Sequence, residues 1–377
     1  METPFVFGKI ASDKNFTDRK NETDRLVSNF QSSVNTILIS PRRWGKSSLV
    51  AKAAEISGKA NKTIRFCFID LNNVRTEEHF YQQLATKVLN ASATKTGILL
   101  ANARKFLGKF IPNITFSPDP GTELKLGLNW KEVKKEPDDI LNLAEKISIE
   151  NSMKFVICID EFQNISEFES PLDIQKKLRS HWQKHKNVSY CLYGSKRHML
   201  MDVFTSPSMP FYKFGDIIFL NKILLADWIP FLQKRFADSG KKIGNSEAAL
   251  IAELTECHPY YVQQLAQQAW LRTKIVCTTP IIEEAFQDLV LQLSMLFQNL
   301  TDGLNKTQLG FLRALTDNID QLSSQKTILD YQLGTSGNVV KIKKTLINKE
   351  IIDLQGSETS FLDPLYKIWL TEYYFKS

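Results

Sequence analysis

The chain has 377 residues, of which 43% are hydrophobic and 24% are charged, a composition typical of globular proteins rather than disordered ones. Its length predicts two or three domains instead of a single core. The 48 lysines and arginines exceed the 41 aspartates and glutamates by a net charge of +7, which permits an anionic partner without requiring one.

The N-terminal stretch METPFVFGKIASDKN lacks the basic and then apolar pattern of a secretion signal. No apolar run reaches the ~20 residues that a membrane span needs. The five cysteines contain no CxxC pair, which predicts reduced, buried thiols, at Cys67, Cys158, Cys191, Cys257 and Cys277. These features predict a soluble cytoplasmic protein with no membrane partner.

Short apolar runs alternate with helical patterns over the first part of the chain, which predicts an α/β domain. Continuous apolar runs are typical of parallel strands covered on both faces, so we expect a parallel sheet sandwiched by helices. Near residues 112–131, alternating apolar residues flank a Pro-Asp-Pro-Gly turn and predict an inserted β-hairpin. The predicted strands are TILIS (36–40), TIRFCFIDL (63–71), KFVICID (154–160), VSYCLYG (188–194) and DIIFL (216–220).

After residue 222 the strand pattern stops, and residues 223–300 show the periodicity of amphipathic helices. Residues 301–377 predict three helices, two short strands around a Gly-Ser turn and a final helix, which is the outline of a winged helix. The predicted domains are therefore 1–222, 223–300 and 301–377. The basic stretch KKLRSHWQKHKN (176–187) is interpreted as a solvated helix face.

The segment SPRRWGKSSL (40–49) follows the first predicted strand and begins a helix. A helix N-terminus presents backbone N–H groups to an anion, and Gly45 lets the backbone approach it closely. Lys46 can reach β- and γ-phosphates, and the Ser47 hydroxyl can ligate Mg²⁺. This is a Walker A pattern with Ser40 in place of its first glycine; the alternative is an ordinary strand–helix loop. The predicted nucleotide-binding residues of the loop are Ser40, Pro41, Arg42, Arg43, Trp44, Gly45, Lys46, Ser47 and Ser48.

Two carboxylates, Asp160 and Glu161, follow the apolar strand KFVICID. A carboxylate at the C-terminal end of a buried parallel strand faces the crevice in which ligands bind. Asp160 is suited to hold Mg²⁺ together with Ser47, and Glu161 to polarise an attacking water. The alternative is an acidic pair at the protein surface without a catalytic role.

These motifs resemble the archaeal-type ATPase family of AAA+/STAND P-loop NTPases, and the likeness covers nearly the whole chain. The resemblance implies a P-loop ATPase domain, an α-helical lid and a C-terminal winged helix, with ATP as the nucleotide and Mg²⁺ as the metal. The stretches that carry it are FTDRKNE (16–22), SPRRWGKSSL (40–49), ICIDEFQNI (157–165), YGSKRHML (193–200), CHPYYVQQLA (257–266) and FLDPLYKIWL (361–370).

The resemblance also implies roles for residues outside the two motifs. Arg19 and Glu22 correspond to a box near the adenine and ribose; without the family, this stretch is only a helix start with Asp18 as the N-cap. Ser195 corresponds to a polar residue that senses the γ-phosphate, the alternative being a plain turn. Pro259 belongs to a lid motif, the alternative being a proline in the first turn of a helix.

Two hypotheses of different class follow for the function. The first is a Mg²⁺-dependent ATPase that uses Lys46, Glu161 and Ser195 and whose slow hydrolysis drives a conformational switch. The second is a non-hydrolysing, nucleotide-loaded scaffold or DNA-binding regulator that acts through the winged helix. A protein partner is favoured over DNA, because residues 301–377 hold nine basic and nine acidic residues. An oligomer is compatible with either hypothesis.

Overall fold

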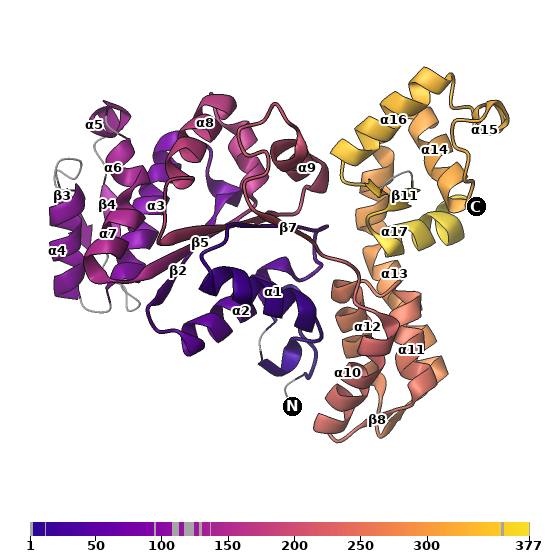
Figure 1. Ribbon diagram of the computed structural model, residues 1–377. Coiled ribbons are helices and arrows are strands. Elements are labelled where there is room, and N and C mark those ends of the chain that lie inside the picture. The colour runs from indigo at the N-terminus through magenta and orange to yellow at the C-terminus, as the bar shows by residue number, and fades with distance from the viewer. Residues whose placement is uncertain are drawn as a thin grey trace. The chain divides into compact units, whose positions relative to one another are not determined.

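The computed structural model describes residues 3–11, 13–93, 96–107, 113–116, 124–127, 130–135, 137–355 and 358–376. The chain divides into two compact units (Figure 1). The sheet unit is the continuous segment Arg19–Asn221, and the C-terminal unit combines residues 1–18 with residues 222–377. The predicted further division at residue 300 stays a prediction.

Five strands in the described part of the sheet unit form one parallel sheet in the order β2-β5-β6-β1-β7. All five predicted strands are confirmed, and β1 pairs with both β6 and β7, so it lies inside the sheet. The strands are β1 (Thr36–Ile39), β2 (Ile64–Asp70), β5 (Lys154–Asp160), β6 (Val188–Gly194) and β7 (Asp216–Phe219).

Helices cover both faces of this sheet, as the apolar strands require. Figure 1 shows α1 and α2 below the sheet, and α3, α8 and α9 above it. The bounds are α1 (Lys20–Gln31), α2 (Lys46–Ala60), α3 (Glu77–Ser92), α4 (Thr96–Leu107), α5 (Trp130–Lys135), α6 (Asp138–Leu141), α7 (Leu143–Asn151), α8 (Pro171–Trp182) and α9 (Arg197–Thr205), with the short 3-10 turns η2 (Leu71–Asn73) and η3 (Phe162–Glu167).

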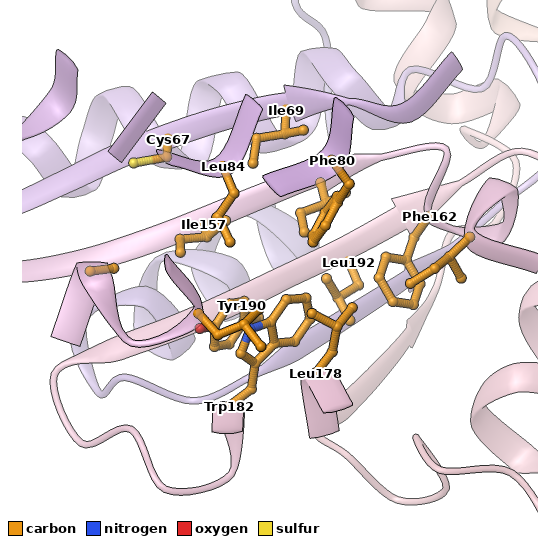
Figure 2. Close-up of a cluster of buried hydrophobic side chains, with 14 of the residues drawn as sticks. Cys67, Ile69, Phe80, Leu84, Ile157, Phe162, Leu178, Trp182, Tyr190 and Leu192 are labelled. Atoms are coloured by element: carbon orange, nitrogen blue, oxygen red, sulfur yellow. The ribbon is translucent and has the colours of Figure 1, made fainter. Parts of the chain in front are cut away.

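The core of the sheet unit is apolar and aromatic (Figure 2). Phe80 and Leu84 of α3 pack with Ile157 of β5, and Trp182 stacks on Tyr190 with ring centroids 4.0 Å apart. Burying side chains of this size contributes roughly 1.5–3 kcal/mol each. This core fixes the strands whose C-terminal ends carry the candidate site.

The predicted β-hairpin is confirmed between the second and third strands of the sheet along the chain. Strand β3 (Asn113–Phe116) pairs antiparallel with β4 (Leu124–Gly127). The predicted Pro-Asp-Pro-Gly turn, residues 118–121, lies outside the described residues.

The C-terminal unit is mainly helical. The predicted order of helices and strands after residue 301 is confirmed: α14, α15 and α16 precede the antiparallel pair β10–β11. The elements are η1 (Asp13–Asn15), α10 (Leu225–Asp238), β8 (Lys242–Ile243), α11 (Asn245–Leu254), α12 (Pro259–Arg272), β9 (Val276–Cys277), α13 (Thr279–Asp302), α14 (Lys306–Thr316), α15 (Gln325–Asp330), α16 (Ser336–Asn348), β10 (Ile352–Gln355), β11 (Glu358–Phe361), α17 (Pro364–Trp369) and the π-helical turn η4 (Leu370–Tyr374).

Polar contacts join distant parts of the C-terminal unit. The Tyr261 hydroxyl of α12 donates to Asp363 Oδ2 at 2.6 Å, and Asp363 also caps the start of α17. At the other end of the chain, Phe5 is buried, and Arg235 of α10 donates to Pro4 O and Asn15 Oδ1, both at 2.8 Å. The N-terminal segment is thus an integral part of this unit's core.

Within the part of the chain that the structure describes, no helix combines the length and hydropathy needed to cross a membrane.

Candidate nucleotide-binding site

The loop between β1 and α2 has the backbone shape that an anion cradle requires. Gly45 precedes the first residue of α2 with φ 86° and ψ 18°, a left-handed conformation that glycine adopts without strain. A Cβ added at Gly45 would meet nothing within 4 Å, so the approach to the helix N-terminus is open on this side. The first N–H groups of α2 point out of the helix end, where the dipole is positive.

The side chains of the loop are divided between the interior and the exterior. Trp44 and Lys46 are buried, and Lys46 Nζ donates to Pro41 O at 3.3 Å across the loop. Ser40, which replaces the first Walker A glycine, is buried and its hydroxyl donates to Pro41 O at 3.1 Å. The loop therefore accommodates a serine there. Arg42 and Arg43 are exposed.

The two predicted metal-binding residues meet directly. Ser47 Oγ donates to Asp160 Oδ2 at 2.7 Å, which joins the first turn of α2 to the end of β5. The backbone N–H of Glu161 donates to Asp160 Oδ1 at 2.8 Å. Burial raises the pKa of Asp160 above its ordinary value, although the hydrogen bond from Ser47 opposes this shift.

Glu161 is held by the end of the neighbouring strand, β6. Its Oε2 accepts hydrogen bonds from the Ser195 N–H at 3.1 Å and from the Ser195 hydroxyl at 2.9 Å, and also from the amide of Gln163. Burial alone would raise the pKa of Glu161, but these hydrogen bonds and the charge of Lys46 outweigh it and lower the pKa. Glu161 is therefore ionised at neutral pH, the form that can accept a proton from water.

Close packing between β6 and Gln163 explains a glycine that sequence reasoning did not assign. A Cβ at Gly194 would lie 2.0 Å from Gln163 Oε1 and 3.3 Å from the Glu161 Cα. Gln163 is itself buried, and the sequence motif ICIDEFQNI predicted no role for it. Its position two residues after Glu161 is the signal that could have indicated a contact with that carboxylate.

Arg19 lies in the sheet unit with its guanidinium buried. Its Nη1 donates to Asn221 O and lies 3.2 Å from Glu22 Oε1, and its Nη2 lies 3.5 Å from Trp44 O. The predicted N-cap at Asp18 is wrong: Arg19 holds this position of α1, and both residues have left-handed backbones, with φ 51° and 62°. The predicted contact of Arg19 with adenine or ribose stays a prediction.

Pro259 is the first residue of α12, in the C-terminal unit, and His258 precedes it as the N-cap residue. This position agrees with the simpler interpretation, a proline in the first turn of a helix. A role for Pro259 in closing over a nucleotide stays a prediction.

The residues at the site fit a magnesium–nucleotide complex. Mg²⁺ in proteins is held by one or two side-chain oxygens and completes its octahedron with phosphate and water oxygens. Ser47 and Asp160 supply such oxygens side by side, next to a helix N-terminus and a buried lysine. Across the described residues, no group of three or more His, Cys, Asp or Glu residues forms a metal site.

The strand order and the loop between β1 and α2 define an AAA+-like fold. Among solved structures, a Walker-type ATPase of Pyrococcus abyssi matches with a TM-score of 0.67 and 17% identity, covering 98% of this chain and 100% of that chain. The ORC2 protein of Aeropyrum pernix, in its ADPNP–ADP complexes, matches at 0.60 and 13%, covering 99% and 98%. The ORC1 protein of the same organism, in complex with DNA, matches at 0.50 and 13%, covering 100% and 99%. No family model matches the sequence, and no curated protein matches it.

Proposed function

We propose that this protein binds ATP with Mg²⁺ and hydrolyses it slowly, and that the nucleotide state sets the conformation of the chain. The observation that carries the proposal is the 2.7 Å hydrogen bond between Ser47 and Asp160. Because this bond joins the start of α2 to the carboxylate at the end of β5, it supports one metal ion shared between them. The description of the matched ORC2 structure as ADPNP–ADP complexes adds support from the fold.

Each site residue has a role in this proposal. The N–H groups at the start of α2 and the Lys46 ammonium bind the phosphates, and Ser47 and Asp160 hold the metal. Bound Mg²⁺ would neutralise charge on the phosphate oxygens. Glu161 orients the attacking water and accepts its proton, while Ser195 and Gln163 fix the position of the carboxylate.

The hydrogen bonds of Ser195 bear on whether this residue contacts Glu161 or the γ-phosphate. Its hydroxyl and N–H both point to Glu161 Oε2, so in this arrangement Ser195 acts on the carboxylate. The role implied by the family resemblance, contact with the γ-phosphate, requires the hydroxyl to rotate away from Glu161. Ser195 is thus placed to exchange a bond to Glu161 for a bond to the phosphate.

The binding step is tested by titrating a fluorescent ATP analogue into the full chain in the presence of Mg²⁺. Lys46→Ala removes the buried ammonium, and we expect it to weaken affinity by about a hundredfold, since charge-assisted phosphate contacts are strong. Lys59→Ala is the matched control, because Lys59 is an exposed lysine in the last turn of the same helix. Equal affinity of the Lys46→Ala variant and the control would contradict the proposal.

The hydrolysis step separates the enzyme from the scaffold hypothesis. Phosphate release by the wild-type chain is measured on the same sample, with the Lys46→Ala variant as the background. Nucleotide binding without release above this background would favour a nucleotide-loaded scaffold.

DNA binding through α16 is a second candidate function. Lys341 and Lys344 are exposed on this helix, and the matched ORC1 structure is described as a complex with DNA. Helices of this kind use lysines to contact phosphates, which makes the affinity depend on salt. Replacing both lysines with alanine should reduce the slope of log K against log salt by about two. An unchanged affinity and slope would remove α16 from any DNA contact.

A further inference from the structure

The chain passes between its two units twice, once between residues 18 and 19 and once between residues 221 and 222. The second crossing comes shortly after β7, the strand that pairs with β1 beside the phosphate-binding loop. Strands β7 and β1 end in register at Phe219 and Ile39, and the Leu220 N–H donates to Ile39 O at 3.0 Å. The 40–48 loop begins directly after β1, and the crossing lies two residues after Phe219, the last residue of β7.

A single guanidinium connects both crossings to this loop. Arg19, the first residue after the first crossing, donates through Nη1 to the backbone carbonyl of Asn221, the last residue before the second crossing. Its Nη2 lies 3.5 Å from the carbonyl of Trp44, the residue before Gly45. Arg19 is 4% exposed, so solvent cannot readily replace a lost bond.

We propose that Arg19 is a positioning residue that couples phosphate binding in the 40–48 loop to the two chain crossings. The inference rests on the proposed nucleotide site but goes beyond it, since it assigns Arg19 to the backbone carbonyls of Trp44 and Asn221 and not to the nucleotide base. The physical reason is the rigid fork of the arginine side chain, in which the two Nη atoms keep a fixed separation. When the Trp44–Gly45 peptide adjusts to a phosphate, the guanidinium must follow it, and the Asn221 carbonyl must move or lose its donor.

The backbone at the first crossing agrees with this role. Asp18 and Arg19 are consecutive non-glycine residues in the left-handed region. Such conformations are sparsely populated, persist only where the surroundings hold them, and are common at switch regions. The Glu22 carboxylate, 3.2 Å from Nη1, balances the buried charge.

The test measures hydrogen exchange of the full chain by mass spectrometry, with and without a slowly hydrolysed ATP analogue and Mg²⁺. In the wild type we expect nucleotide to slow exchange in residues 219–224 by about fivefold, a shift typical of a locally stabilised segment. In Arg19→Gln this slowing should fall below about twofold, measured at an analogue concentration that saturates the variant. Arg19→Lys keeps the charge but cannot span both carbonyls, so it should also lose the response.

Arg25→Gln is the matched control. Arg25 lies in the same helix and pairs with Asp216 at the start of β7, so its loss removes an arginine contact to that strand away from the crossing. This variant should respond to nucleotide as the wild type does.

Three results would overturn the coupling. The first is a wild-type nucleotide response retained by Arg19→Gln, or by Arg19→Lys if the glutamine variant does not fold. The second is loss of nucleotide binding by a stably folded Arg19 variant, which would make Arg19 part of the binding site itself. The third is a wild type that binds nucleotide without any change in residues 219–224. A wild type that binds no nucleotide would refute the proposed function first, and the coupling with it.

Discussion

The two compact units use their buried polar side chains in different ways. In the sheet unit, Ser47, Asp160, Glu161 and Ser195 converge on one point at the ends of β1, β5 and β6, and burial shifts the pKa of Asp160 there. In the C-terminal unit, Tyr261 and Asp363 hold two distant segments of chain together, in a contact that also caps a helix. The first arrangement gathers polar side chains at neighbouring strand ends, and the second links two segments within one unit.

This difference shows that a marked sequence motif does not by itself indicate a ligand site. CHPYYVQQLA and FLDPLYKIWL belong to the same family resemblance as the P-loop stretch. Tyr261 of the first stretch donates a hydrogen bond to Asp363 of the second. Substitutions at Glu161 should therefore change activity, and substitutions at the Tyr261–Asp363 contact should change stability alone.

The largest expected effect is that of Glu161→Gln on hydrolysis. The amide keeps the shape of the side chain but cannot accept a proton from water, so we expect kcat to fall about a hundredfold or more. Nucleotide affinity should stay within about threefold of wild type, because Lys46 and Ser47 are untouched. Phosphate release and analogue binding are measured together. Glu167→Gln, at the end of η3, serves as the control. Hydrolysis at the wild-type rate would exclude Glu161 as the base.

Gly194→Ala tests the close packing behind Glu161. The added methyl group would overlap Gln163 Oε1, and we expect a loss of about 2 kcal/mol in stability together with slower hydrolysis. Urea unfolding checks the stability. Gly58→Ala in α2 is the contrasting control, since its Cβ would have no neighbour nearer than 3.8 Å, and it should stabilise the chain by about 0.5–1 kcal/mol. A harmless Gly194→Ala would mean that Gln163 can move freely.

A pH dependence is expected from His185, away from the site. Its Nδ1 is 2.8 Å from the Tyr190 hydroxyl and its Nε2 is 3.0 Å from Asn142 Oδ1. Since the amide oxygen only accepts, Nε2 carries the hydrogen and Nδ1 accepts from the buried tyrosine. The pKa of His185 is lowered from 6.5 to about 4, mainly because of burial; Glu145 opposes this shift and the nearby His181 adds to it.

The sign of the pH effect follows from this depressed pKa. Between pH 6.5 and 4 the unfolded chain binds a proton at His185 that the folded chain does not, so stability falls as the pH decreases. At pH 5 the loss is about 2 kcal/mol, measured as the difference in urea unfolding between pH 7 and pH 5. His185→Gln should reduce this difference by the same amount. A variant with the full pH dependence of the wild type would assign it to other groups.

Tyr261→Phe should have the smallest effect on stability and no effect on nucleotide affinity. It removes the hydroxyl that donates to Asp363 at 2.6 Å, while Asp363 still accepts from the backbone N–H groups of Leu365 and Tyr366. We expect a loss of about 1 kcal/mol in stability and no change in nucleotide affinity. Tyr373→Phe, at a partly exposed tyrosine, is the control. A change in nucleotide affinity would show that this contact also serves the site.

The sheet and the contact between Ser47 and Asp160 were predictable because their signals are local. Continuous apolar runs marked all five strands, and the parallel order brought Ser47 and Asp160 together once both strand ends were known. The β-hairpin at β3 and β4 was likewise marked by its own alternation.

The features that the sequence did not reveal depend on contacts between distant segments. The stretch 176–187 was interpreted as a solvated helix face, yet Trp182 is buried and His185 bonds to Tyr190 and to Asn142, on a separate element. The guanidinium of Arg19 reaches a carbonyl 202 positions away. No local periodicity encodes either contact, because both depend on which strand lies next to which.

The membership of residues 1–18 in the C-terminal unit has a consequence for biosynthesis. Pro4 and Phe5 are translated before their partners on α10, which emerge only after the whole sheet unit has been translated. At typical elongation rates that interval is roughly ten to forty seconds. The sheet unit can fold as a continuous nascent segment during this time, while Phe5 remains without its core contacts on α10.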